Sequence, residues 1–390
     1  MHKITSTLIS LDIWIIGLLT AASFVSEKTL VWAVGSVIFF GVIRWIERRS
    51  FIIRTPADWP ILMMVLLLPV NIWATADLGT TLPQVLRLLT GIGLYYTVIN
   101  WSESTHRIRW LVRGIWLASL ILSLYAFISV EWTSAKFTFI PPSLYGQFQI
   151  LVSDTTHPNV MAGTLAILLP ISLNLIIFGG LRRHWLDISL ATISTLMAML
   201  VMVLTQSRGG ILALVLIMAL IILLRWKRGW IIISGLTILI IALIVWLGPD
   251  RVVNVLFANS TLGGIDGRLE VWSRALYIIQ DFPITGVGIG TYTHVVDLIY
   301  PFFSYAPGTI VHAHNLFFQI AVDLGIAGLI SWLSIWALIS VTAFYIYKRA
   351  RKDHDDWFLG LSVGLLCSQV ALVAHGLMDA VTWGMIKAAP

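Results

Sequence analysis

Long apolar stretches, separated by short polar ones, recur along the whole chain. They run for roughly 17 to 25 residues, the length at which a helix crosses a hydrocarbon core about 30 Å thick. They lack the alternation of apolar and polar residues that marks barrel strands, and a membrane admits only helices or closed barrels. The pattern therefore predicts an all-α polytopic membrane protein with eleven or twelve transmembrane helices. The eleven predicted spans cover residues 6–24, 29–43, 57–74, 82–100, 110–129, 158–178, 185–205, 209–224, 229–248, 324–347 and 357–378.

The composition agrees with this pattern, because 58% of the residues are hydrophobic and only 11% are charged, where a soluble domain has about 25% charged residues. The formal net charge of +6 is expected to reflect orientation in the membrane, and nucleic acid is not an expected partner. The single cysteine, Cys367, lies inside an apolar stretch, which leaves no internal disulfide and no cysteine-based metal site. The first apolar stretch is expected to remain as an uncleaved span.

The basic residues give the spans an orientation. With the amino terminus in the cytoplasm, 17 of the 25 lysines and arginines fall in the amino-terminal tail and five short inner loops, and seven fall outside. Inner loops are enriched in lysine and arginine in this way. The sequence therefore predicts a cytoplasmic amino terminus.

Two outer loops are long, residues 130–157 and 249–311, and a short amphipathic helix is expected at 314–323. The second loop is too rich in aromatic and apolar residues to be disordered, so we expect a folded cap. The chain is accordingly divided into 1–150, which holds the amino-terminal helices and the first outer loop, and 151–390, which includes the loop 249–323. The stretch 381–390 is too short to cross again, so we expect either that the carboxyl terminus lies outside or that the sequence lacks a twelfth span.

Four arginines near the outer boundary are candidates for a site that binds an anion. Arg208 joins two strongly apolar spans, where it is either a snorkelling anchor or a planar clamp for phosphate oxygens. Arg268 follows a glycine at a predicted helix start, and Arg274 continues that helix; an amphipathic helix lying on the membrane explains both equally well. Arg87 lies inside a span near its outer end and is a secondary phosphate contact in this hypothesis.

The histidines near the outer face are candidates for a general base. His312 and His314 open the short helix, and residues two apart face opposite sides of a helix, so only one of them is expected to reach a substrate. Asn315 is a candidate to orient that imidazole. His157, before Pro158, is expected to cap a helix. The glycines of 286–292 (GVGIGTY) match no nucleotide loop and predict a tight turn.

Seven short motifs follow one another in a recognisable order over roughly residues 155–380: HPN (157–159), TQSRGG (205–210), GRLEVW (267–272), GVGIGTY (286–292), HAHNLFFQ (312–319), DLGIAGL (323–329) and HGLMD (375–379). This order resembles the bacterial O-antigen ligase and O-antigen polymerase superfamily. The resemblance implies a GT-C-type membrane glycosyltransferase that passes a glycan from undecaprenyl pyrophosphate to a lipid-core, glycan or protein acceptor outside the cytoplasmic membrane. It also implies an inverting reaction without ATP, metal or other cofactor.

The family's functional residues match three positions here. By resemblance, Arg208 and Arg268 hold the donor pyrophosphate and His314 activates the acceptor hydroxyl, with His312 as the alternative base. Two other classes of function stay open. A transporter, of bicarbonate or of a lipid-linked substrate, would place ionisable groups near the bilayer midplane and show inverted repeats, and we find no internal repeat. A non-catalytic scaffold for envelope assembly would tolerate replacement of these residues.

Overall fold

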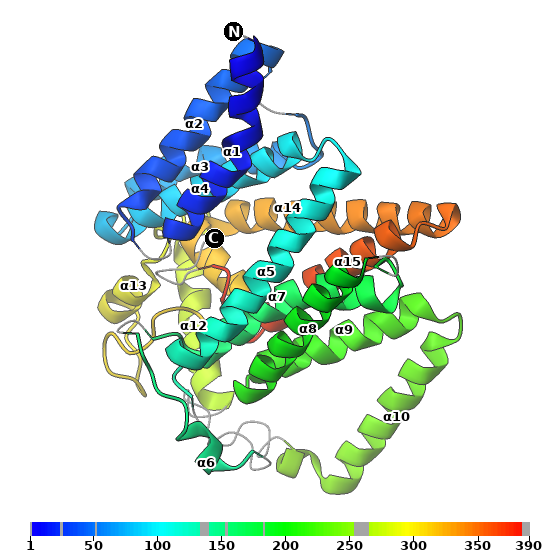
Figure 1. The fold of residues 1–390 in the computed structure, drawn as a ribbon. Helices are drawn as coiled ribbons and strands as arrows, with labels where there is room; N and C mark the ends of the chain where they lie inside the picture. The colour runs from blue at the N-terminus through cyan, green and yellow to red at the C-terminus, as the bar shows by residue number, and fades with distance from the viewer. Residues whose placement is uncertain are drawn as a thin grey trace.

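The computed structural model describes residues 2–23, 26–50, 53–132, 140–152, 155–181, 184–252 and 265–383. Helices dominate these ranges (Figure 1). In chain order they are α1 (His2–Ser23), α2 (Thr29–Arg48), α3 (Asp58–Ala74), α4 (Leu78–Trp101), α5 (Thr105–Ser129), α6 (Pro142–Tyr145), α7 (Pro158–Ile177), α8 (Trp185–Leu204), α9 (Arg208–Arg225), α10 (Gly229–Leu247), α12 (Ile265–Asp281), α13 (Tyr292–Ile299), α14 (Leu316–Asp353) and α15 (Asp356–Gly376).

Each of the eleven predicted spans falls on one of these helices. Within the described ranges, nine helices are long and apolar enough to cross a membrane, and the apolar parts of α1 and α3 are shorter. The all-α polytopic architecture is therefore confirmed. The start of α4 moves from the predicted position 82 to Leu78, because the Asp77 side chain accepts a hydrogen bond from the Gly79 amide (2.9 Å) and caps the helix.

The centre of the bundle is α7, which packs against α5, α8, α9 and α15. Buried side chains of α5, α7, α8, α9, α14 and α15 form one continuous apolar core. Close approach of α15 to α7 depends on small residues: a Cβ added at Gly364 would lie 2.9 Å from the Ile171 Cα. Glycine contacts of this kind are typical of helix packing in membranes, where the backbones must come close.

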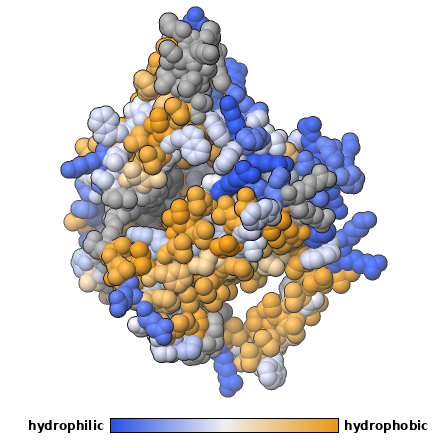
Figure 2. All heavy atoms as spheres, viewed as in Figure 1, coloured by the Kyte–Doolittle hydropathy of each residue, from blue (hydrophilic) through white to orange (hydrophobic). Residues whose placement is uncertain are grey.

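Large apolar side chains also cover much of the outside of the bundle. They include Ile238, Ile241 and Trp246 of α10, a helix on which the most apolar stretch buries no residue inside the protein. Figure 2 shows this apolar surface running across the lower part of the view, over α10 and the helices beside it. A soluble protein rarely exposes so much contiguous apolar surface, whereas a lipid-facing bundle must.

A helical cap lies at one end of the bundle, where α12 and α13 gather (Figure 1). It has its own apolar core, in which Val271 and Ile278 of α12 pack with Tyr292 and Val296 of α13. The predicted folded cap is thus confirmed for 265–311, while 253–264 lie outside the described residues. The predicted turn is present at 286–290, where three glycines have positive φ values of 61°, 102° and 83°.

The helix α14 is broken near its start. Gly325 has φ 72° and ψ −178°, which separates a short segment, 316–324, from the long membrane helix that follows. The freed amide of Ile326 donates to the Pro283 carbonyl (2.7 Å), so the break is bonded to the cap. A short helix followed by a span was predicted here, and the structure confirms it with a later start, at Leu316 instead of His314.

Candidate active site

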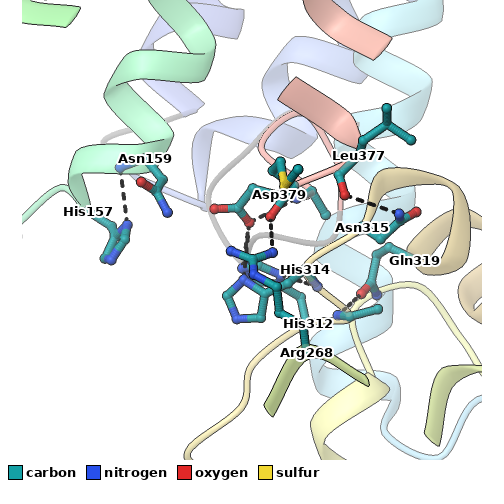
Figure 3. Close-up of polar contacts among 12 residues, drawn as sticks. His157, Asn159, Arg268, His312, His314, Asn315, Gln319, Leu377 and Asp379 are labelled. Carbon is teal, nitrogen blue, oxygen red and sulfur yellow. Dashed lines mark hydrogen bonds and ion pairs between the residues drawn. The ribbon is translucent and has the colours of Figure 1, made fainter. Parts of the chain in front are cut away.

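Four separate parts of the chain meet beneath the cap. They are the loop 312–315 before α14, Arg268 on α12, the segment 377–383 after α15 and the first residues of α9. Figure 3 shows the first three of these together. The segment 377–383 contributes Asp379, which the side chains of His312 and His314 both approach. Residues far apart in the sequence are therefore brought to a single site.

Asp379 is almost fully buried, with 3% of its surface exposed. One carboxylate oxygen, Oδ1, lies 3.4 Å from Nε2 of His312 and 3.4 Å from Nδ1 of His314. The same oxygen accepts a hydrogen bond from the Ala380 amide (2.9 Å). Sequence reasoning missed this residue, although it ends the HGLMD motif, because a polar residue after the last span looks like an ordinary helix end.

Both histidines face this carboxylate, so the prediction that they point in opposite directions is wrong. Opposite directions would require a helix, but 312–315 is a loop, and the ring centroids of His312 and His314 are only 4.0 Å apart. His314 has a left-handed backbone (φ 47°), and its amide donates to Nδ1 of His312 (3.1 Å). This turn folds the two imidazoles onto the same side.

Burial and neighbouring charge set the protonation states of this cluster. Burial lowers the pKa of His312 to about 3, and the nearby His314 adds to the effect. Burial works against ionisation of Asp379, yet the adjacent His312 and His314 bring its pKa well below the ordinary value. Near neutral pH the site therefore holds a neutral His312 beside an ionised Asp379.

His314 is the accessible member of the pair. Its side chain is 19% exposed, against 3% for His312. With Nδ1 directed at the Asp379 carboxylate, the favoured tautomer carries the proton on Nδ1 and leaves Nε2 free to accept one. His312 stabilises the loop by accepting the hydrogen bond from the His314 amide. His314 has the geometry of a general base.

The two predicted arginines lie beside this cluster. Nη1 of Arg268 donates to the Met378 carbonyl (2.8 Å), next to Asp379. Burial lowers the pKa of Arg268, and Asp379 partly offsets this. Arg208 opens α9, is close enough to Arg268 for their charges to repel, and its neighbour Gly209 packs against Met378. Two partly buried cations at such close range favour an anionic ligand.

The other predicted site residues have structural partners. Arg274 is buried in the cap, 3.8 Å from Glu270, with its guanidinium over the Phe303 ring (4.9 Å). Arg87 forms an ion pair with Glu27 (2.9 Å), so its phosphate contact stays a prediction. The Asn315 Oδ1 accepts from the first amides of α14, which makes this residue a helix cap; the carboxylate beside the histidines comes from Asp379.

Two further histidines surround the cluster. His157 caps α7 as predicted, since its Nδ1 accepts from the Asn159 amide (3.2 Å) (Figure 3). His375, which sequence reasoning did not assign, is buried on α15. A Cβ at Gly163 would lie 2.8 Å from its ring, so the glycine makes room for this imidazole. His375 and Asp379 line a small cavity with an empty volume of about 170 Å³.

The same cluster has a geometry that a metal ion could use. One donor atom each from His312, His314 and Asp379 lies within 4.8 Å of the others. Two imidazoles and a carboxylate are a common ligand set for a divalent cation. The positive charge of Arg268 beside Asp379 opposes a cation at this position. The absence of a metal in the reaction therefore stays a prediction.

Comparison with known families finds a match over part of the site. A family model described as O-antigen ligase matches residues 193–333, from within α8 to within α14. The match confirms the resemblance drawn from the motifs and includes Arg208, Arg268, His312 and His314. No curated protein matches the chain.

Proposed function

From the premise that residues 193–333 carry an O-antigen ligase domain, we propose that the protein is a polyprenyl-diphosphate-dependent glycosyltransferase. It moves a glycan from undecaprenyl pyrophosphate to a hydroxyl of a lipid-core, glycan or protein acceptor at the outer face of the cytoplasmic membrane. The observation that carries this proposal is the convergence of His314, Asp379 and Arg268 at one buried site. A base, a carboxylate that orients it and an anion clamp are the groups that such a transfer needs.

Arg208 and Arg268 bind the donor through its pyrophosphate. Each guanidinium stays charged and offers a planar pair of donors to phosphate oxygens. Their mutual repulsion in the free enzyme is relieved when the anion enters. Neutralising the pyrophosphate makes it a better leaving group, so the donor itself drives the reaction and no nucleotide is required.

His314 activates the acceptor. Nε2 takes the proton of the acceptor hydroxyl while its oxygen attacks the anomeric carbon of the glycan. The bond from that carbon to the pyrophosphate oxygen breaks, and the electron pair leaves with undecaprenyl pyrophosphate. Attack opposite the leaving group inverts the anomeric centre. Asp379 holds the Nδ1 proton and stabilises the imidazolium that forms.

The test is direct. The purified protein is given an undecaprenyl-pyrophosphate glycan and candidate acceptors without ATP, and released undecaprenyl pyrophosphate is measured. His314→Ala should abolish release, and Arg208→Ala or Arg268→Ala should weaken donor binding. Arg251→Ala removes an exposed arginine and serves as the control. Full activity of His314→Ala would overturn the catalytic assignment, and unchanged donor binding in both arginine variants would remove the clamp.

A further inference from the structure

A second buried carboxylate lies outside the candidate active site. Asp323 is on α14, two residues before the break at Gly325, and has no exposed surface. Its Oδ1 accepts from Nε2 of Gln319 (3.0 Å) and from the Gly290 amide (3.3 Å), and its Oδ2 accepts from Nε1 of Trp383 (2.9 Å). These donors are all neutral, and burying a carboxylate among neutral groups is costly.

The first donor connects Asp323 to the catalytic loop. Gln319 uses its other side-chain atom, Oε1, to accept from the Ala313 amide (2.7 Å). Ala313 is the residue between His312 and His314, and it is fully buried. Two hydrogen bonds in series therefore join the Asp323 carboxylate to the backbone that presents His314.

The second donor connects Asp323 to the segment that carries Asp379. Trp383 is 1% exposed and ends the described chain four residues after Asp379. The third donor, Gly290, belongs to the cap turn, whose residue Gly288 also donates to the Asp323 carbonyl (3.3 Å). One residue thus holds the three segments that surround the site.

The catalytic pair depends on this arrangement, because its two members come from different segments. His314 lies in the loop before α14, and Asp379 lies after α15. Their contact of 3.4 Å requires both segments to keep a fixed separation. Misplacing a catalytic group by about 1 Å can lower a rate by about 100-fold.

We propose that Asp323 is a positioning residue that sets the separation of His314 and Asp379 through Gln319 and Trp383. The proposal rests on the proposed function, because it concerns the rate of the same transfer. The hydrogen-bond partners of the Asp323 side chain are Gln319, Gly290 and Trp383, and neither proposed pyrophosphate-binding arginine is among them. A change at Asp323 should therefore affect turnover without affecting pyrophosphate binding.

The experiment compares Asp323→Asn and Gln319→Met with Asp297→Asn in the full-length protein. Asp297 accepts one amide hydrogen bond at the rim of the cap (Gly308, 2.7 Å), so its variant makes the same chemical change elsewhere. In the first two variants we expect kcat to fall by about 10- to 100-fold and donor affinity to stay within about twofold. Hydrogen exchange of the Ala313 amide should become faster. Asp297→Asn should resemble the wild type in all three measurements.

The outcomes separate the two proposals. A wild-type protein with no transferase activity defeats the proposed function, while faster exchange at Ala313 in Asp323→Asn would still support the link to the loop. Wild-type kcat and wild-type exchange in both variants overturn the positioning role. A fall in donor affinity equal to the fall in kcat also overturns it. If Asp323→Asn does not fold, Trp383→Phe decides, because it removes one N–H and keeps the aromatic volume; unchanged kcat in that variant refutes the Trp383 link.

Discussion

At the scale of single residues, the buried carboxylate of Asp379 supplies the negative charge that lies beside both imidazoles. Asp379→Asn keeps the shape of the side chain and removes the charge that faces the two imidazoles. We expect kcat to fall by about 100- to 10,000-fold, because the His314 tautomer is no longer fixed and its protonated form is no longer stabilised. Donor binding should persist, since Arg208 and Arg268 remain.

Initial rates and donor affinity, measured on the same preparation, check this prediction. Asp355→Asn is the matched control, because Asp355 is a carboxylate that caps the opposite end of α15. Asparagine keeps an oxygen that caps the helix, so this variant should change stability little and leave kcat unchanged. Wild-type turnover in Asp379→Asn would show that the carboxylate does not assist the histidine.

The lowered pKa of His312 predicts how the stability of the fold depends on pH. Its pKa is about 3 in the folded protein and 6.5 when unperturbed. Between these values the unfolded chain binds a proton that the folded protein does not, so acidification favours unfolding. The contribution of neutral His312 is complete above about pH 6.5 and is lost as the pH falls towards 3. The carboxylate of Asp379 contributes a further loss of stability only below about pH 3.8, the ordinary pKa of aspartate, because there the unfolded state takes up a proton before the folded state does.

Thermal unfolding in detergent at several pH values measures this dependence. The Tm of the wild type should fall between about pH 6.5 and pH 4, and His312→Gln should show a shallower fall. The comparison isolates one histidine from the others in the chain. Parallel curves for the two proteins would contradict a neutral, buried His312.

Whether the reaction needs a metal ion also depends on a few single residues. His312, His314 and Asp379 approach one another closely enough to ligate a cation, but Arg268 supplies positive charge beside them. We expect turnover after exhaustive chelation to stay within about twofold of the untreated enzyme. A loss that a divalent cation restores would reverse this prediction and make the cluster a metal site.

The sequence could nominate Arg208, Arg268 and His314 because charged and polar residues are scarce near the outer face. It could not identify Asp379, since hydropathy places this residue only at the end of a span. The joint orientation of His312 and His314 depends on one left-handed residue, and helical periodicity assumes the opposite. The pattern of apolar and polar residues in the sequence does not predict contacts that depend on backbone turns or on segments far apart in the chain.

At the scale of elements, the break in α14 connects the membrane bundle to the cap. A Cβ at Gly325 would lie 2.6 Å from the Ile284 carbonyl oxygen and 2.7 Å from that of Pro283. Its φ of 72° is also unfavourable for any residue with a side chain. We therefore expect Gly325→Ala to destabilise the protein by about 1 to 3 kcal/mol, measured as a lower Tm.

Gly235→Ala is the control for this substitution. Gly235 lies inside α10, and a Cβ there meets nothing within 4 Å. Alanine favours a helix interior over glycine, so the Tm should stay the same or rise slightly. Equal losses in the two variants would mean that the break at Gly325 is not required.

The helices themselves were predictable because lipid imposes one length and one kind of element. Local capping explains some boundary shifts, as at α4, where Asp77 starts the helix earlier than hydropathy indicates. The helix α13 was not predicted, although its glycine-rich approach was identified as a turn. Its position depends on packing against α12, and an apolar pattern of eight residues cannot specify that.

At the scale of the whole molecule, the cap and the basic inner loops lie at opposite ends of the bundle. Figure 1 shows α12 and α13 at the left, and the connections from α9 to α10 and from α14 to α15 at the right. Those connections carry Arg228, Lys227 and the basic end of α14. The positive-inside rule then predicts that the cap faces outwards, which is the arrangement that an undecaprenyl-linked donor outside the membrane requires.

Labelling of single cysteines tests this orientation. Cys367 is buried, and Cys367→Ala provides a background without thiols. Ala306→Cys introduces a thiol on the exposed cap, and Lys227→Cys introduces one in the turn between α9 and α10. An impermeant maleimide should label the Ala306→Cys protein in intact cells and the Lys227→Cys protein only after permeabilisation. Labelling in the reverse order would place the candidate active site in the cytoplasm, where a donor displayed outside could not reach it, and the proposed transfer would fail with the topology.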